Sequence, residues 1–267
     1  MVQTRRIAAL AGLLLFGLLG SLAGSPSGLS VLPLSGFSGK LKAFFALPSE
    51  PVTEGDAAVR IPLVPFSAKV NGRIGSYKLG EWPSEKRPIS SPSYANPRGF
   101  VEVTPDNLST HLSEHFTLGQ FVTKDQPSIW PKYVVLQPRL LDKLELTIEE
   151  LAREGHPVRS LYVMSGFRTP EYNEQGVGAG GRSAVSRHQY GDAADVYPDD
   201  RGRGRMDDLN GDGRVDTKDA RILANAAEAV ERQHPELVGG IGIYPATSGH
   251  GPFVHIDARG TRARWGW

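Results

Sequence analysis

Apolar positions recur with helical spacing in two segments of this 267-residue chain. In residues 137–154 the apolar side chains fall on one helical face, with Pro138 near the start and Gly155 just past the end. Residues 217–233 repeat the pattern. We therefore predict two helices whose apolar faces pack against the core of the protein.

Short apolar runs predict strands in the second half of the chain, at 158–165, 193–197, 239–244 and 252–257. Upstream, residues 58–80 are rich in β-branched side chains and contain Asn71-Gly72, the dipeptide most typical of a tight hairpin. Helices and short strands alternate without regular βαβ repetition. This pattern predicts an α+β fold with a small antiparallel sheet flanked by helices and preceded by a small β unit.

Composition divides the chain into four parts. Residues 1–24 carry two arginines, an apolar run and then small residues, the order of a secretory signal peptide; an uncleaved membrane anchor is the alternative. Residues 25–50 are rich in Ser, Gly and Pro and predict a linker. Residues 51–99 predict the small β-rich unit, whose role is not legible, and residues 100–267 predict the main domain.

Composition also limits the chemistry that is open to the protein. The chain has no cysteine, which excludes disulfides, thiolate metal sites and a lipoprotein anchor. Removing the leader removes two arginines and no acid, leaving 28 basic and 29 acidic residues, so nothing favours nucleic acid or an anionic membrane. We expect a monomeric protein of the periplasm or cell envelope with no membrane contact beyond the leader.

The stretch "SRHQYGDAADVY" contains a candidate metal site. His188 and Asp195 flank Gly191, and a backbone turn at this glycine would bring the imidazole and the carboxylate together. A catalytic zinc typically takes three protein ligands and a water, and His255, in the apolar strand "FVHID", is the best third ligand. Taken singly, a hydrogen-bonded core histidine and a turn-capping aspartate are the alternatives.

Two other patterns give weaker signals. His111 and His115 are spaced like a helical metal pair in "HLSEH", but no third ligand lies near them in sequence. The glycine-rich segment "GVGAGGRSA", residues 176–184, lacks the strand-to-helix context and the lysine of a phosphate loop. We therefore exclude nucleotide binding and interpret this segment as a flexible loop.

Four motifs, "SGFRTPEYN", "SRHQYGDAADVY", "GGIGIY" and "FVHID", follow one another in order. This ordered set resembles the zinc D-alanyl-D-alanine carboxypeptidase group, which shares its fold with murein endopeptidases and the hedgehog signalling domain. The resemblance covers roughly residues 100–267 and is nearest to a peptidase-like bacterial envelope branch. It implies zinc ligation by His188, Asp195 and His255, and hydrolysis of D-amino-acid amide bonds in peptidoglycan stem peptides, by either a carboxypeptidase or an endopeptidase reaction.

The resemblance also implies roles for residues beside the ligands. Arg168 matches the family arginine that contacts the carbonyl or terminal carboxylate of the substrate, and a surface ion pair is its alternative role. Ser186 and Tyr190 fall within a family motif and are expected to line the site.

One position departs from the family pattern. Established peptidases carry Glu, Asp or His two or three positions before the third ligand, where this chain has Phe253 and Pro252. Asp257, on the same strand face as His255, and His250, in the preceding loop, are the two candidates for the general base. The departure keeps open an alternative function, a non-catalytic zinc-stabilised module that binds peptidoglycan or an envelope partner.

Residues 208–219, "DLNGDGRVDTKD", follow the spacing of an EF-hand calcium loop and resemble the loops of dockerin modules. The predicted calcium ligands are the side chains of Asp208, Asn210, Asp212, Asp216 and Asp219 and the backbone carbonyl of Arg214. We expect a structural calcium that holds the helix after the loop. An acidic surface loop without metal, or a calcium-dependent adhesion or scaffold protein, would explain the same pattern.

Overall fold

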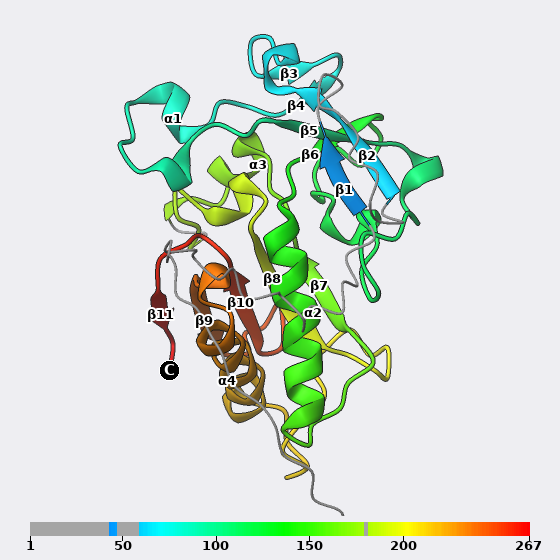
Figure 1. Ribbon diagram of the computed structural model, residues 1–267, viewed down its shortest axis with the longest axis vertical. Helices are drawn as coiled ribbons and strands as arrows, with labels where there is room; N and C mark the ends of the chain where they lie inside the picture. The colour runs from blue at the N-terminus through cyan, green and yellow to red at the C-terminus, as the bar shows by residue number, and fades with distance from the viewer. Residues whose placement is uncertain (1–42, 47–58, 179–180) are drawn as a thin grey trace, which may run out of the picture. The chain divides into compact units, whose positions relative to one another are not determined.

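The computed structural model describes residues 43–46, 59–178 and 181–267, which all belong to one compact unit (Figure 1). The fold is α+β, as predicted, and its described residues form sheets of five, four and two strands and two long helices. The predicted signal peptide and most of the predicted linker lie outside the described residues. Within the described ranges, no helix is long and apolar enough to cross a membrane.

The larger sheet has five strands in the order β11-β9-β10-β8-β7. Its pairs are antiparallel except for β11, which runs parallel to β9. The strands are β7 (Leu161–Ser165), β8 (Ala193–Pro198), β9 (Gly240–Tyr244), β10 (Phe253–Asp257) and β11 (Ala263–Trp265). The first four coincide with the apolar runs that predicted them, whereas β11 had no such signal.

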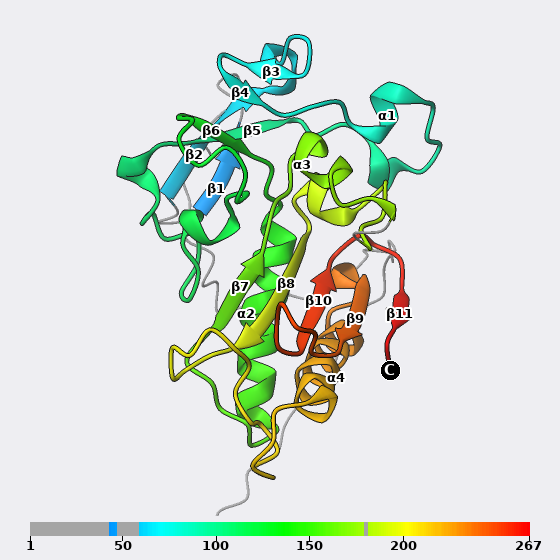
Figure 2. The same cartoon turned by 180° about the vertical axis from the view of Figure 1, so that it is seen from behind.

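The two predicted helices are confirmed as α2 (Pro138–Arg153) and α4 (Thr217–Gln233). They pack against each other, and α4 also packs on β9 and β10. Figures 1 and 2 show both helices on the same face of the five-stranded sheet. The apolar stripe of α2 is buried as expected, with Leu140, Leu141 and Leu144 fully covered. Each such leucine contributes about 1.5–3 kcal/mol through removal of its side chain from water.

A buried lysine joins the two helices to the sheet. The ammonium of Lys143 on α2 donates to Glu231 on α4 at 2.6 Å and to the backbone carbonyl of Asp257 on β10, also at 2.6 Å. Burial lowers the pKa of Lys143, and the neighbouring carboxylate of Glu231 opposes that shift. Because the buried charge is paired, it fixes the position of β10 relative to both helices.

The smaller sheet has four strands in the order β1-β2-β5-β6. These strands are β1 (Ala43–Ala46), β2 (Val59–Pro65), β5 (Gly99–Val103) and β6 (Lys132–Val134). β1 falls within the predicted linker. The boundary predicted after residue 99 falls at the first residue of β5, so the sheet contains strands from both sides of it.

The hairpin signal at Asn71-Gly72 is confirmed. Both residues have positive φ, 48° and 71°, and Val70 and Arg73 exchange backbone hydrogen bonds across the turn. The turn leads into β3 (Arg73–Ile74) and β4 (Tyr77–Lys78). Two short helices complete the fold, α1 (Pro83–Lys86) and α3 (Pro170–Glu174), the latter directly after the loop that leaves β7.

Gly191 is a position where we expect a single methyl group to be strongly destabilising. Its φ is +68°, and a Cβ would lie 2.3 Å from the carbonyl oxygen of Val135. We predict that Gly191→Ala lowers the free energy of unfolding by at least about 3 kcal/mol, because overpacking adds to left-handed strain.

Gly202→Ala is the matched control, because Gly202 has a φ of +63° and nothing within 4 Å of its virtual Cβ. This variant should lose only about 1–2 kcal/mol. Urea denaturation followed by circular dichroism measures both values. Equal losses would contradict the close approach at Gly191.

Candidate metal centre

The register of the five-stranded sheet places two candidate ligands side by side. Asp195 on β8 and His255 on β10 are direct cross-strand partners, and Ser165 on β7 pairs with Asp195 on its other side. Val254 and Ile256, which alternate with His255 along β10, belong to the hydrophobic core. Because side chains alternate across a strand, the three polar residues share the opposite face.

His188 reaches this face through a tight turn. A 3₁₀ turn, Arg187–Tyr190, ends at Gly191 in the left-handed conformation, and the chain then enters β8. The His188 Nε2 atom comes to lie 3.2 Å from Asp195 Oδ1. The turn at Gly191 therefore brings the imidazole and the carboxylate together, as the sequence predicted.

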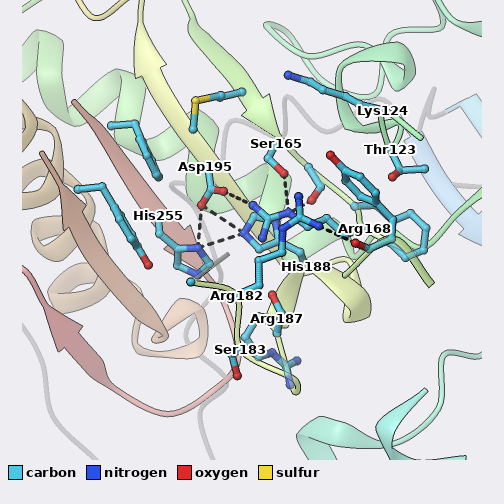
Figure 3. A pocket seen from close by; sticks show the side chains of 18 of the residues that line it. Thr123, Lys124, Ser165, Arg168, Arg182, Ser183, Arg187, His188, Asp195 and His255 are labelled. Atoms are coloured by element: carbon cyan, nitrogen blue, oxygen red, sulfur yellow. Dashed lines mark hydrogen bonds and ion pairs between the residues drawn. The ribbon is translucent and has the colours of Figure 1, made fainter. Parts of the chain in front are cut away.

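The three predicted ligands converge on one point (Figure 3). His188 Nε2 lies 3.2 Å from His255 Nδ1, which in turn lies 3.0 Å from Asp195 Oδ1. Tetrahedral coordination with bonds of about 2.0–2.1 Å separates ligand atoms by about 3.3 Å, so these atoms form one face of such a tetrahedron. All three residues are buried, and among the described residues they form the one group of His, Cys, Asp or Glu side chains with metal-ligand spacing.

Hydrogen bonds on the far side of the two imidazoles decide which ring nitrogen carries the proton. His188 Nδ1 lies 2.7 Å from the carbonyl oxygen of Gly166, which can only accept, so Nδ1 carries the proton. His255 Nε2 lies 3.0 Å from the Asp257 carboxylate and is likewise the donor. The neutral rings then direct lone pairs at each other and at Asp195, an arrangement that a central cation relieves.

The protonation properties of His188 and Asp195 favour the forms that bind a metal. Burial lowers the pKa of His188, which favours the neutral, ligating form. Burial alone would raise the pKa of Asp195, but His188, His255 and Arg168 together hold it well below its usual range. For His255, burial is outweighed by hydrogen bonds to Asp195 and Asp257, which raise its pKa. These residues fit a metal ion, since a deprotonated carboxylate and two imidazoles meet at one buried point.

The triad forms part of the wall of a cavity of about 700 Å³. Arg168, His250 and Ser186 also line it, as expected for a substrate site, whereas Tyr190 and Asp257 are not among its lining residues. Tyr190 instead packs against Tyr94, with ring centroids 5.3 Å apart. Its position differs from the expected one because the 3₁₀ turn directs its ring away from the cavity.

Arg168 forms contacts with the triad itself. Its Nη2 forms an ion pair with Asp195 Oδ2, and its Nε donates to the Ser165 hydroxyl at 2.8 Å. The side chain is only 14% exposed, so this is not a surface ion pair. Arg168 orients the ligand carboxylate, and only part of its guanidinium remains for a substrate.

Asp257 and His250, the two candidates for the general base, occupy different positions. Asp257 is fully buried behind His255, where it also accepts from the backbone N–H of Gly240 at 2.8 Å and from Arg259. This position suits a group that orients an imidazole, not one that exchanges protons with the cavity. His250 lines the cavity and is half-buried.

Residues 51–99, for which the sequence indicated no role, contact the candidate site directly. Trp82 is fully buried and donates from Nε1 to the carbonyl of Gln189 at 2.8 Å. Arg187 donates to the carbonyl of Ser93 at 2.6 Å and lies under the ring of Tyr94. These contacts brace the turn that carries His188. They join residues about a hundred positions apart, so no local sequence pattern announces them.

The C-terminal strand adds another wall residue that the sequence did not reveal. Trp265 pairs with Gly242, and a Cβ on this glycine would lie 2.0 Å from the indole. The indole therefore occupies the space above Gly242 and lies next to His255, with ring centroids 5.2 Å apart. Gly242 in "GGIGIY" was the available signal, because a strand glycine often marks a close approach.

The predicted calcium loop lies between Asp195 and His255 in the sequence and is exposed from Asn210 to Arg214. Asp208 accepts from the backbone N–H groups of Gly211 and Gly213, both at 2.8 Å. Asp219 is fully buried and accepts from backbone groups of the loop, including Leu209 at 2.8 Å. Within the described ranges, the acidic side chains of this loop do not form a second group with metal-ligand spacing.

The remaining predicted ligand residues follow the same local pattern. Asn210 and Asp212 accept from backbone groups two positions later, at 2.8 and 2.9 Å, and Asp216 caps α4 through Lys218. Arg214 is exposed. The loop is therefore ordered by hydrogen bonds from its backbone N–H groups to its own side-chain oxygens.

Comparison with known proteins assigns no family to this chain. No protein-family profile matches it, and no curated protein is significantly similar to it. The site is therefore defined by its own geometry, a buried triad of two imidazoles and one carboxylate that could hold a metal ion.

Removal of the charge on Asp257 should weaken metal binding. Asp257→Asn keeps the shape of the side chain but loses the strong acceptor behind His255, and outer partners of this kind change metal affinity about 10- to 100-fold. Zinc affinity is measured by competition with a chromophoric chelator. Asp207→Asn, which removes a carboxylate paired with Arg203, is the control and should bind zinc like the wild type. Unchanged affinity in Asp257→Asn would contradict the orienting role.

Proposed function

We propose that this protein is a zinc-dependent peptidase of the bacterial cell envelope that hydrolyses D-amino-acid amide bonds in peptidoglycan stem peptides or cross-links. The observation that carries the proposal is the buried triad at the wall of a cavity of about 700 Å³. Two imidazole nitrogens and one carboxylate oxygen suit zinc better than calcium or magnesium, which prefer oxygen ligands. The substrate class rests on the resemblance of the four ordered motifs to the carboxypeptidase group.

The proposed mechanism assigns a holding role to the triad. A zinc ion bound by His188, Asp195 and His255 supplies Lewis acidity toward a carbonyl oxygen and lowers the pKa of water. The chain keeps these ligands in place through Asp257 behind His255 and Arg168 on the second oxygen of Asp195. The buried surroundings strengthen these charged contacts, because water does not compete for them.

Proton transfer is assigned to His250. Its Nδ1 lies 2.8 Å from the carbonyl oxygen of Gly251, which can only accept, so Nδ1 carries the proton and Nε2 keeps its lone pair. The ring packs edge-on against Phe253, with centroids 5.0 Å apart, and lines the cavity. A histidine whose Nε2 keeps its lone pair and lines the cavity can accept a proton there, as a general base does.

Two variants test this assignment. His188→Ala should lose both zinc and hydrolysis, because it removes a ligand. His250→Gln should keep zinc and lose hydrolysis by about 10²- to 10⁴-fold, because it removes only proton transfer. Muropeptides digested with zinc-loaded and chelator-treated protein are analysed by liquid chromatography and mass spectrometry. Wild-type rates in His250→Gln would remove His250 from the mechanism.

A non-catalytic binding module is the second candidate, and the apolar pair Pro252 and Phe253 before the third ligand favours it. The same digestion separates the two functions. If intact muropeptides bind the zinc-loaded protein but emerge uncut at every metal loading, the chain recognises peptidoglycan without cleaving it.

We further propose a structural calcium in the loop 208–219. The spacing of its oxygens supports this, as does the direct continuation of the loop into α4, which begins at Thr217. The carboxylates would exchange some of their backbone hydrogen bonds for the ion. A calcium ion held there would clamp the start of α4, and we assign it no role in hydrolysis.

Calcium should therefore raise the thermal midpoint of the wild type, by an amount that corresponds to about 2.7 kcal/mol at a hundredfold excess over Kd. Asp208→Ala should lose this response and keep its zinc content. Asp106→Ala removes an exposed carboxylate outside the loop and should retain the response. Differential scanning calorimetry with calcium or a calcium chelator measures the midpoints, and equal calcium responses in both variants would rule out the loop site.

A further inference from the structure

The cavity beside the triad carries more positive than negative charge. Asp195 is the one acidic residue that lines it. Three of its arginines, Arg168, Arg187 and Arg259, are each paired with an aspartate. Two lining cations, Arg182 and Lys124, have no acidic partner among the residues that the structure describes. The cavity therefore suits a ligand that brings its own negative charge.

Arg182 is held in place without a carboxylate. Its guanidinium carbon lies 4.3 Å from the centroid of the Tyr172 ring, and its Nη1 donates to the Tyr172 carbonyl at 2.5 Å. Its side chain crosses Gly176, where a Cβ would lie 2.3 Å from the arginine Cδ. The stacking and the glycine notch fix the guanidinium before any ligand arrives, which reduces the entropy lost on binding.

Arg182 lines the cavity and keeps donors that no described residue accepts from. Tyr172 takes one hydrogen of Nη1, and no described residue accepts from Nη2. Figure 3 shows Arg182 extending from its loop into the cavity that holds His188, Asp195 and His255. No described residue accepts from Nε either, so the edge between Nε and Nη2 remains open to a planar, bidentate acceptor, and a carboxylate has this geometry.

We propose that Arg182 is the residue that binds a carboxylate of the ligand in this cavity. The identity of that ligand as a peptidoglycan peptide rests on the proposed function. Arg168, which the family resemblance suggested for this contact, is occupied by Asp195 and Ser165. Arg182 is a specificity-determining residue, and it takes no part in proton transfer.

A stem pentapeptide tests the proposal, because it carries two carboxylates that can be amidated separately. The probes are L-Ala-γ-D-Glu-L-Lys-D-Ala-D-Ala, its C-terminal amide and its D-isoglutamine form. Kd by calorimetry is measured for zinc-loaded protein, with KM where the probe is cleaved. Wild type should bind the free acid about 10- to 100-fold better than one of the two amides, since a charge-assisted bidentate contact is lost. The amide that binds weakly tells which carboxylate Arg182 contacts.

Substitutions at Arg182 distinguish a bidentate hydrogen bond of the guanidinium from a purely charge-based attraction. Arg182→Gln should bind acid and amide alike, and Arg182→Lys should recover only part of the discrimination because it lacks the fork. Lys124→Gln removes an exposed charge from the same cavity and should weaken all three probes by less than about 3-fold. Zinc content and circular dichroism confirm that each variant is folded.

The outcomes of this inference and of the proposed hydrolysis are distinguishable. Loss of discrimination in Arg182→Gln without cleavage of any probe supports the carboxylate site and contradicts hydrolysis. Cleavage with unchanged discrimination in Arg182→Gln supports hydrolysis and overturns the role of Arg182. Equal binding of acid and amides by the wild type, or equal losses in Lys124→Gln and Arg182→Gln, also overturns it.

Discussion

The pairing of β8 with β10 in one register is the constraint on which the candidate site depends. Asp195 and His255 face each other across the two strands, and a shift of one residue would turn one of them to the other face of the sheet. The apolar neighbours Val196 and Val254 are paired in the same register and are buried in the core. The packing of the hydrophobic core therefore sets the geometry of the polar triad, and this geometry does not depend on contacts between the three polar side chains.

Further contacts keep the triad rigid from behind. Asp257 orients His255, and its backbone carbonyl accepts from Lys143, which also binds Glu231 on α4. Both long helices, α2 and α4, are thus connected to β10, which carries His255, through buried, paired charges. Such connections leave few alternative positions for the imidazole, which is the condition for a preformed metal site.

Two arginines that line the cavity make different electrostatic contacts. Arg168 neutralises the second carboxylate oxygen of Asp195, whereas Arg182 stacks on Tyr172, donates to its carbonyl and has no acidic partner among the described residues. The difference follows from position, since Arg168 leaves the end of β7 beside β8 and Arg182 belongs to the glycine-rich segment. A cavity with an uncompensated, stacked guanidinium favours anionic ligands.

Local sequence patterns alone determined the long helices, four strands of the larger sheet and the Asn71-Gly72 hairpin, because these depend on neighbouring residues. The grouping of His188, Asp195 and His255 into a candidate metal site was also predictable, since each lies in a recognisable motif. The braces from Trp82 and Ser93, the inward position of Asp257 and the stacking of Arg182 were decided only by the tertiary structure. These contacts depend on strand register, on glycine notches and on the packing of distant segments, none of which leaves a local pattern in the sequence.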